Sequence, residues 1–362
     1  MTLRVLAGRG RVAAVTGSVL VAIAGGCSQP GDEGPGRPGP TAQESGGGST
    51  GPARPAAPPG DTPLAGATFY VDPSTPAATQ AARWDATGRA DDARQLDKIG
   101  GRPIAHWLTG GEPDAVRAEA DDYVGRAAAA GQLPLLVAYH IPNRDCGSYS
   151  AGGAPSAEHY RAWIRAVAAG IGDRPVAVVL EPDAVAQTLA ECRGVSAERY
   201  ALLSDAVTVL KKAARTHVYV DAGNPTWVRD VGALAGGLRQ AGVPRADGFA
   251  LNVSNFVTTK DNLSYGNWLS DALDGAHFVI DTSRNGNGPW PDGTEVNGAP
   301  AWCNPPGRVL GAAPTTGAGM PRVDALLWVK RPGDSDGACR PGEPAAGEWW
   351  PEYALDMARR SS

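Results

Sequence analysis

Four apolar runs in this sequence end in aspartate, and these aspartates are the residues whose type and spacing could do chemistry. The run Val178–Leu180 leads directly into Glu181, Pro182 and Asp183. Carboxylates gathered in one place act as general acids and bases or hold a metal ion. In the other three runs, Asp145 follows Leu135–Tyr139, Asp221 follows Val218–Val220, and Asp334 and Asp336 follow Leu326–Val329.

The elements that position these aspartates are predicted to be parallel strands. Continuous apolar runs that alternate with helical patterns are typical of a parallel sheet, which crossover helices cover on both faces. Sites in such sheets form where the carboxyl ends of the strands meet. We therefore expect a barrel-like α/β fold of seven or eight strands, with helices that include Asp114–Ala130 and Ser156–Ala169. The expected strands are Thr68–Val71, Ile104–Leu108, Leu135–Tyr139, Ala177–Leu180, His217–Val220, Phe249–Val253, Phe278–Ile280 and Ala325–Val329.

Composition limits the class of protein. The chain has 362 residues, a net charge of -5 and 42% hydrophobic residues, which is enough for one large α/β domain. It has no basic surplus of the kind that binds nucleic acid, so no nucleic-acid partner is expected.

The N-terminal segment has the pattern of an export signal. Arginines precede the apolar run Val19–Gly26, which stops at Cys27 and is too short to span a membrane. Ile23–Cys27 resembles a bacterial lipoprotein cleavage site, and the alternative is a plain secretory signal because Ala24 replaces the usual Leu or Val. We predict a signal peptide at residues 1–27 with a lipidated Cys27, a disordered Gly/Pro/Ser-rich linker at residues 28–63, and a folded domain at residues 64–362.

The cysteine count agrees with export. The chain has five cysteines, and a lipid on Cys27 leaves Cys146, Cys192, Cys303 and Cys339 in the folded domain. Two disulfides are favoured over a metal site, because none of the four falls in a Cys-x-x-Cys pair. The sequence also has no EF-hand loop and no closely spaced histidine pair, so we expect no metal and no cofactor.

Each candidate residue also has a plainer interpretation. Asp183 could simply cap a helix over Ala184–Ala190, although its clustering with other acids favours chemistry. Trp107, Trp227 and Trp302 could stack on sugar rings, whereas core packing is the commoner fate of tryptophan. The long segment Asn285–Gly319 is predicted to be a functional loop, since loops of this length are uncommon in compact domains.

Taken together, the motifs resemble glycoside hydrolase family 6, the cellulase family of endoglucanases and cellobiohydrolases. The resemblance covers Ala67–Met357 and implies a distorted α/β barrel of about seven parallel strands, with the active site at their carboxyl ends. The motifs are Tyr139–Gly147, Val179–Asp183, Tyr219–Gly223, Asp281–Pro289, Trp302–Pro305 and Lys330–Gly337.

The resemblance implies hydrolysis of β-1,4-glucan with inversion at the anomeric carbon. Asp183 matches the general acid, and Asp145 matches the carboxylate that holds up the pKa of that acid. Asp336 matches the proposed base, with a water chain near Asp145 as the alternative. Tyr139 would distort the sugar at the cleavage point, and Asp221 would support the site.

Other positions match the family's sugar contacts and disulfides. Asn224 stands where a histidine is common, Asp334 where glutamate is usual, and Ala151 where a serine can occur. The matching sugar-binding residues are Trp107, Trp227, Trp302, Asn224, Asn255, Lys330 and Asp334, and the matching disulfides are Cys146 with Cys192 and Cys303 with Cys339.

We expect an exported, monomeric endoglucanase whose membrane contact is the lipid on Cys27. The loops Asp145–Pro155 and Asp336–Tyr353 are short, which predicts an open cleft and internal cleavage of the glucan. The alternatives are exo-action of the cellobiohydrolase type, a metal-dependent hydrolase, and a surface glucan-binding lipoprotein with little turnover. Retention of the acids argues against a protein that only binds, because binding needs only the tryptophans.

Overall fold

Seven parallel strands form a single curled sheet in the computed structural model, in the order β1-β2-β3-β4-β5-β6-β9. This confirms the predicted distorted α/β barrel. The structure describes residues 62–190, 192, 194, 196–291 and 293–362, so the predictions for residues 1–61, Cys27 included, lie outside the described residues. The strands are β1 (His106–Leu108), β2 (Leu135–Ala138), β3 (Val176–Leu180), β4 (Thr216–Asp221), β5 (Gly248–Leu251), β6 (His277–Asp281) and β9 (Val323–Leu327).

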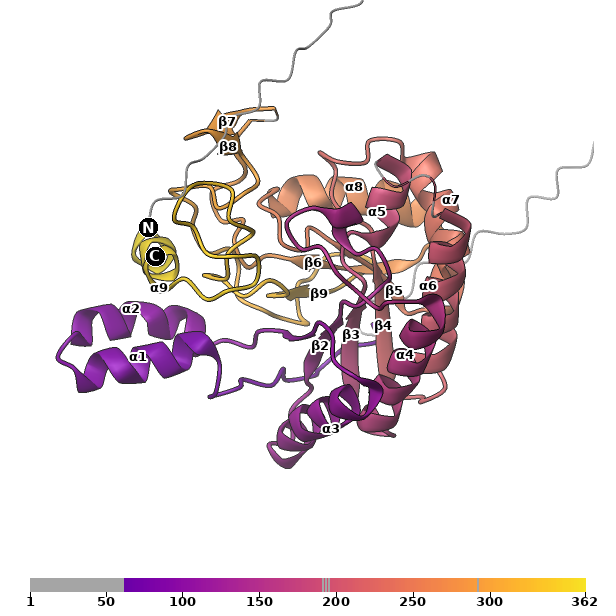
Figure 1. The fold of residues 1–362 in the computed structure, drawn as a ribbon, viewed down its shortest axis with the longest axis horizontal. Helices are drawn as coiled ribbons and strands as arrows, with labels where there is room; N and C mark the ends of the chain where they lie inside the picture. The colour runs from indigo at the N-terminus through magenta and orange to yellow at the C-terminus, as the bar shows by residue number, and fades with distance from the viewer. Residues whose placement is uncertain (1–61, 191, 193, 195, 292) are drawn as a thin grey trace, which may run out of the picture. The chain divides into compact units, whose positions relative to one another are not determined.

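Helices connect the successive strands from β1 to β6 and cover the outer face of the sheet (Figure 1). The two helices predicted individually correspond to α3 and α4. The Ser156 side chain caps α4, because its hydroxyl accepts a hydrogen bond of 3.1 Å from the His159 N–H. These helices are α3 (Pro113–Ala129), α4 (Ala157–Ile171), α5 (Ala184–Ala190), α6 (Ser196–Leu210), α7 (Val231–Ala241) and α8 (Thr259–Ala272).

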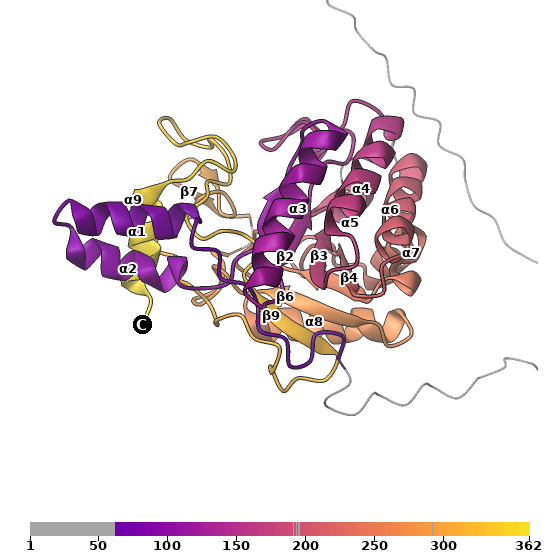
Figure 2. The ribbon, with the colours of Figure 1, turned by 90° about the horizontal axis from the view of Figure 1, so that it is seen from below.

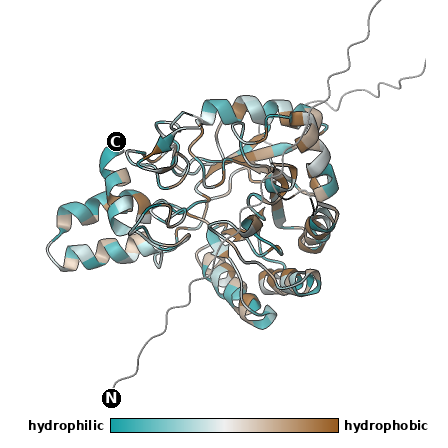
Figure 3. Cartoon of the chain, turned by 45° about the horizontal axis from the view of Figure 1, so that its top comes forward, coloured by the Kyte–Doolittle hydropathy of each residue, from teal (hydrophilic) through white to brown (hydrophobic). Residues whose placement is uncertain are grey.

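The strands are buried on both faces because their residues alternate between two apolar clusters. On β3, Val178 and Leu180 join the outer cluster beneath the helices, which contains Trp163. Ala177 and Val179 point the other way, into the inner cluster of the barrel. Figure 3 shows hydrophobic residues gathered along the strands and on the helix sides that face them. This double burial explains why the strands read as unbroken apolar runs in the sequence.

The edge strands β1 and β9 are linked by hydrogen bonds next to the predicted site. The Ala105 N–H donates to the Trp328 carbonyl at 3.0 Å. The Trp107 indole N–H donates to the Val329 carbonyl at 2.8 Å. Trp107 is therefore held in a fixed orientation at the carboxyl ends of both strands.

A third apolar cluster lies among α1 (Pro76–Ala86), α2 (Ala90–Gly100) and α9 (Pro351–Arg360). Figure 2 shows α9 crossing the α1 and α2 pair. The Lys98 ammonium ties α2 to the end of α9 by donating to the Ala358 carbonyl at 3.1 Å and the Ser361 carbonyl at 2.6 Å. The first and last helices of the domain thus support one another.

The predicted strand Thr68–Val71 is wrong. Within it, Phe69 makes only an isolated parallel bridge to Leu133. The segment lies between a turn at Gly66, where φ is 73°, and a turn at Asp72. Pro73 follows and has no N–H to donate, so strand pairing cannot be extended beyond Asp72. The segment between the two turns is too short for a ladder. The predicted loop Asn285–Gly319 is largely irregular, with one small hairpin formed by β7 (Glu295–Val296) and β8 (Ala299–Pro300).

Candidate active site

A cleft of about 1070 Å³ runs along the carboxyl ends of the strands. This volume is at the upper end of the usual range for ligand pockets, about 300 to 1,000 Å³. Asp221 is buried beneath the cleft and does not line it. The other predicted site residues line it together: Trp107, Tyr139, Asp145, Asp183, Asn224, Trp227, Asn255, Trp302, Lys330, Asp334 and Asp336.

Asp183 occupies the turn between β3 and α5. Its backbone has a φ of 71°, in the left-handed region, and its side chain is half-buried. Its carbonyl accepts the first helical hydrogen bond from Gln187, at 2.8 Å, so Asp183 stands at the N-cap position of α5. The backbone of Asp183 thus starts the helix, while its side chain lines the cleft.

Asp221 holds the backbone of Asp183 in place from the end of β4. Its Oδ1 accepts the Asp183 N–H at 2.8 Å and the Gly223 N–H at 3.0 Å. Its Oδ2 is buried without a hydrogen-bond partner. Burial raises the pKa of Asp221 to about 7, although these backbone N–H groups oppose the shift.

Asp145 is tied to the helix that begins at Asp183. Its Oδ1 accepts from the Gln187 side-chain amide at 2.7 Å, and its Oδ2 accepts from the Ser150 N–H at 2.6 Å. Asp145 itself has a φ of 55°, and Cys146 beside it has a φ of 49°. Such left-handed backbone persists only where surrounding contacts hold it, and it is common in functional loops. Here the Gln187 bond couples the positions of the two predicted acids.

Asp336 forms an ion pair with the fully buried Arg284. The Arg284 Nη2 lies 2.9 Å from Asp336 Oδ1, and the Lys330 ammonium lies 3.3 Å from the same oxygen. The Asn304 N–H donates to Asp336 Oδ2 at 3.1 Å. Burial alone would raise the pKa of Asp336, but the charges of Arg284 and Lys330 outweigh it and hold this pKa below its ordinary value.

Tyr139 lies at the end of β2 with its ring almost fully buried. Trp107 meets it edge to face with ring centroids 5.4 Å apart, and the Arg144 guanidinium lies 4.5 Å from the Tyr139 ring centroid. Burial raises the pKa of Tyr139, and the charges of Asp183 and Asp145 raise it further. Its hydroxyl therefore stays protonated and can donate a hydrogen bond into the cleft.

The predicted sugar-binding residues differ in exposure. Trp302 is 45% exposed and meets the equally exposed Tyr149 with ring centroids 5.6 Å apart. Asn224 is buried, and its side-chain oxygen accepts from the Thr226 N–H and hydroxyl at 3.0 and 2.8 Å. The Asn255 side-chain oxygen accepts from the following N–H at 2.8 Å. Trp302 thus offers a partly exposed ring, while the amides are held by local turns.

Asp334 and Lys330 are both largely buried at the same end of the cleft. Asp334 Oδ2 accepts from the Arg331 Nε at 2.7 Å, while its Oδ1 is buried without a hydrogen-bond partner. Burial raises the pKa of Asp334, although Arg331 and Lys330 oppose the shift. The Lys330 ammonium donates to the Ser335 carbonyl at 3.0 Å. The Asp334 carboxylate is therefore held by Arg331 in the wall of the cleft.

Sequence comparison decides the family of this domain. The family model of glycosyl hydrolases family 6 matches residues 64–361. The chain belongs to this family. Endoglucanase A of Cellulomonas fimi is 49% identical over 297 residues, which are 81% of this chain and 61% of that protein. Endoglucanase A of Thermobispora bispora is 42% identical over 303 residues, which are 81% of this chain and 62% of that protein. The chain therefore spans about three fifths of the length of these two relatives.

A solved structure is similar to this family 6 domain in both sequence and fold. The endoglucanase Cel6 of Mycobacterium tuberculosis, in complex with a thio-linked methyl cellobiosyl cellobioside, superposes with a TM-score of 0.76 at 45% identity. The match covers 83% of this chain and 99% of that chain. No helix in the described part of the chain combines the length and apolar character needed to cross a bilayer.

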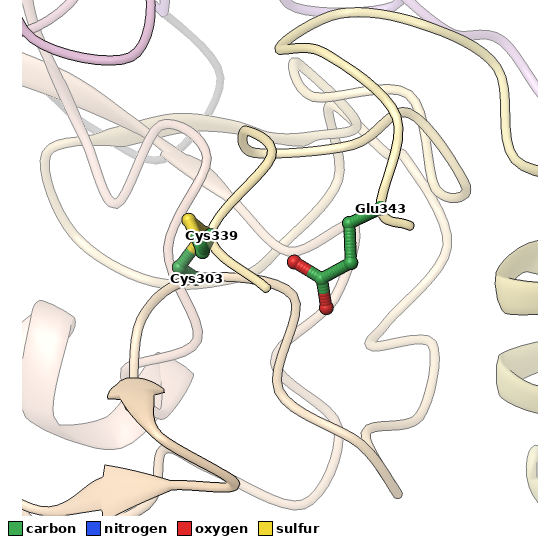
Figure 4. Close-up of side chains that lie close together, drawn as sticks. All are labelled: Cys303, Cys339 and Glu343. Atoms are coloured by element: carbon green, nitrogen blue, oxygen red, sulfur yellow. A yellow bond between two sulfur atoms is a disulfide. The ribbon is translucent and has the colours of Figure 1, made fainter. Parts of the chain in front are cut away.

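Both disulfides implied by the family resemblance are present in the family 6 domain, Cys146–Cys192 and Cys303–Cys339. Among the described residues, one group of three potential metal ligands lies within 4.8 Å, namely Cys303, Cys339 and Glu343 (Figure 4). The two sulfurs are bonded to each other and so are not thiolate ligands. Glu343 is already paired with Arg340 at 2.8 Å. This cluster is therefore structural.

Three supporting residues of the family 6 site were given no role from the sequence, although Glu181 was noted at the end of an apolar run. Gln187 binds Asp145, and Arg284 binds Asp336. Glu181 is fully buried and accepts the His140 and Ile141 N–H groups, each at 3.0 Å. Gln187 stands one helical turn after Asp183, a spacing that could have identified it, since side chains four residues apart share one helix face.

Proposed function

We propose that this chain is an endo-acting β-1,4-glucanase that inverts the anomeric centre, with Asp183 as the general acid. The observation that carries the proposal is the position of the Asp183 carboxylate. It lines a cleft between the predicted sugar platforms, on a turn whose N–H is fixed by Asp221. A general acid must be held this firmly to reach the glycosidic oxygen.

In the proposed reaction, the Asp183 carboxyl gives its proton to the glycosidic oxygen while the bond from that oxygen to the anomeric carbon breaks. A water molecule attacks the anomeric carbon from the opposite face and loses a proton to a base, which leaves an inverted hemiacetal. The Tyr139 ring, held by Trp107 and Arg144, limits the space for the sugar at this position and favours a distorted ring.

The environment of Asp336 supports the water chain near Asp145, rather than Asp336, as the route to the base. A carboxylate held by Arg284 and Lys330 with a lowered pKa is a weak proton acceptor. We therefore assign to Asp336 the electrostatic stabilisation of positive charge on the sugar. The proton of the water passes toward Asp145, whose two oxygens are already oriented by Gln187 and Ser150.

Internal cleavage is supported by the exposure of the rings along the cleft. Tyr149 and Trp302 are each 45% exposed, whereas rings beneath a closed roof of loops would be buried. The two relatives described above, which are 49% and 42% identical to this chain, are both named endoglucanases. An open cleft lets a glucan chain bind anywhere along its length, so cleavage starts inside the polymer.

The test is to plot the viscosity of carboxymethylcellulose against the reducing ends released. A steep early fall in viscosity supports endo-action. A nearly constant viscosity with cellobiose as the first product would show exo-action. Asp183→Ala should release almost no reducing ends while it retains affinity for the polymer. A wild-type protein that binds the polymer but releases no reducing ends would support the glucan-binding alternative.

We also propose that residues 1–27 are a signal peptide, that lipid is attached to Cys27, and that residues 28–63 tether a monomeric catalytic domain at residues 64–362. The support is the apolar run that ends at Cys27, and disulfides that fit an exported protein.

Wild-type protein should partition into detergent and Cys27→Ala should not. An intact mass that shows an unmodified Cys27 would overturn the anchor, and gel filtration tests the monomer.

A further inference from the structure

Trp290 lines the cleft but has no assigned role. It is 36% exposed, whereas the core tryptophans Trp163 and Trp328 are 0% and 2% exposed. Pro289 and Pro291 flank it and restrict the backbone on both sides. Core packing therefore does not explain Trp290.

The indole ring of Trp290 is held in one orientation. Its N–H donates to the Pro306 carbonyl at 3.4 Å, and the Arg308 guanidinium lies over the ring at 5.2 Å from the centroid. Arg308 is in turn fixed, since it donates to the Gly288 carbonyl. Arg308 thus covers one face of the ring. The exposed surface of Trp290 therefore belongs to the opposite face and an edge of the ring.

The segment that carries Trp290 is supported by the β7–β8 hairpin, which Figure 1 shows apart from the seven-stranded sheet. Val296 and Ala299 pair across this hairpin, and both are buried. The Arg340 guanidinium ties it to the C-terminal loop by donating to the Val296 carbonyl at 3.1 Å and the Cys303 carbonyl at 3.1 Å. The cleft wall beside Trp290 is therefore a braced structure.

We infer that Trp290 is the stacking platform of an additional glucosyl subsite at the β7–β8 end of the cleft, separate from Trp107, Trp227 and Trp302. The flat apolar face of a glucose ring would lie on the free face of the indole. Thr294 and the exposed Glu295 follow Trp290 closely in the chain and also line the cleft, so they would bind sugar hydroxyls. This inference rests on the proposed function, because it assumes that the cleft binds a glucan chain.

The test compares cello-oligosaccharides of increasing length on wild type, Trp290→Ala and Trp268→Ala. Trp268, on α8, is a matched control because it is 64% exposed and does not line the cleft. For wild type, kcat/KM should rise with each added glucose until the cleft is filled. Trp290→Ala should lose the gain in kcat/KM that the last added glucose gives. Its kcat/KM should therefore be about 3- to 10-fold below wild type on the longest oligosaccharides and equal to wild type on the shortest. Trp268→Ala should match wild type at every length.

Two further measurements separate stacking from a folding defect and from failure of the proposed function. Trp290→Phe keeps an aromatic face but loses the N–H. If stacking is the cause, this variant should recover most of the kcat/KM that Trp290→Ala loses on the longest oligosaccharides. Calorimetry in an Asp183→Ala background measures the affinity for the same oligosaccharides, and so the contribution of the subsite to binding, without turnover. An equal loss at all lengths, or no loss in kcat/KM and binding, would overturn the subsite. A wild type that cleaves no oligosaccharide would overturn the proposed function, while the binding series still decides the subsite.

Discussion

Replacing Arg284 should destabilise the domain more than any exposed ion-pair substitution. Arg284 is fully buried, forms an ion pair with Asp336, donates to the Ser254 carbonyl at 2.5 Å and lies 4.3 Å from the Phe256 ring centroid. In Arg284→Met the buried Asp336 carboxylate would keep only the Lys330 ammonium and one N–H as partners. Breaking a buried ion pair by removing one partner costs about 3 to 5 kcal/mol.

This loss of free energy of unfolding corresponds to a fall in Tm of about 6 to 10 °C, at about 2 °C per kcal/mol for a large domain. The effect should depend on pH. Because folding depresses the Asp336 pKa below its ordinary value of 3.8, the ion pair stabilises the fold above that pH. The stabilisation is lost as pH falls through the folded pKa, so the gap between wild type and Arg284→Met should shrink below about pH 4.

The assay is urea denaturation of wild type, Arg284→Met and the control Arg94→Gln, at pH 6 and in steps down to about pH 3. Arg94 pairs with Asp91 where both side chains are exposed, so its loss should change the free energy of unfolding by about 1 kcal/mol or less. The role given to this ion pair would be refuted if Arg284→Met differed from wild type in free energy of unfolding no more than the control does. It would also be refuted if that difference grew as pH falls.

Two further predictions concern the buried carboxyls. Asp221→Asn keeps an oxygen for the Asp183 and Gly223 N–H groups and should lose little kcat, whereas Asp221→Ala should lose about 100-fold through misplacement of Asp183. Equal losses in steady-state assays would argue against this anchoring role. Folding raises the pKa of Glu181 and of Asp221 to about 7. The folded state therefore binds these protons more tightly than the unfolded state, and the stability that they add is lost as pH rises through 7. Tm by calorimetry should therefore fall between about pH 5 and pH 8, and a steady rise over that range would contradict the prediction.

The parallel strands and the ends that carry Asp145, Asp183 and Asp221 were predictable because both signals are local. An apolar run buried on both faces is visible in a few residues, and the acid that follows it must lie at the strand end. The strand at Thr68–Val71 was overpredicted, because β propensity alone does not show that turns at Gly66 and Asp72 leave too little room for pairing.

The supporting contacts were not predictable in the same way. Arg284 and Asp336 are separated by 52 residues along the chain, and no period or spacing brings them together. Trp290 was seen only as part of a long loop, since its fixed ring depends on Arg308 and Pro306 across that loop. Pairings of this kind are a property of the folded loop rather than of any local pattern.

If Asp183 protonates the leaving oxygen while water attacks from the opposite face, the product forms with inverted configuration at the anomeric carbon. The most direct test is proton NMR of the first products formed from a soluble cello-oligosaccharide, recorded before the anomers equilibrate, with wild type and with Asp183→Ala. We predict that wild type releases the α-anomer first, and that Asp183→Ala forms product slower by about 100-fold or more. Initial release of the β-anomer would exclude inversion, and near wild-type rates for Asp183→Ala would exclude Asp183 as the general acid.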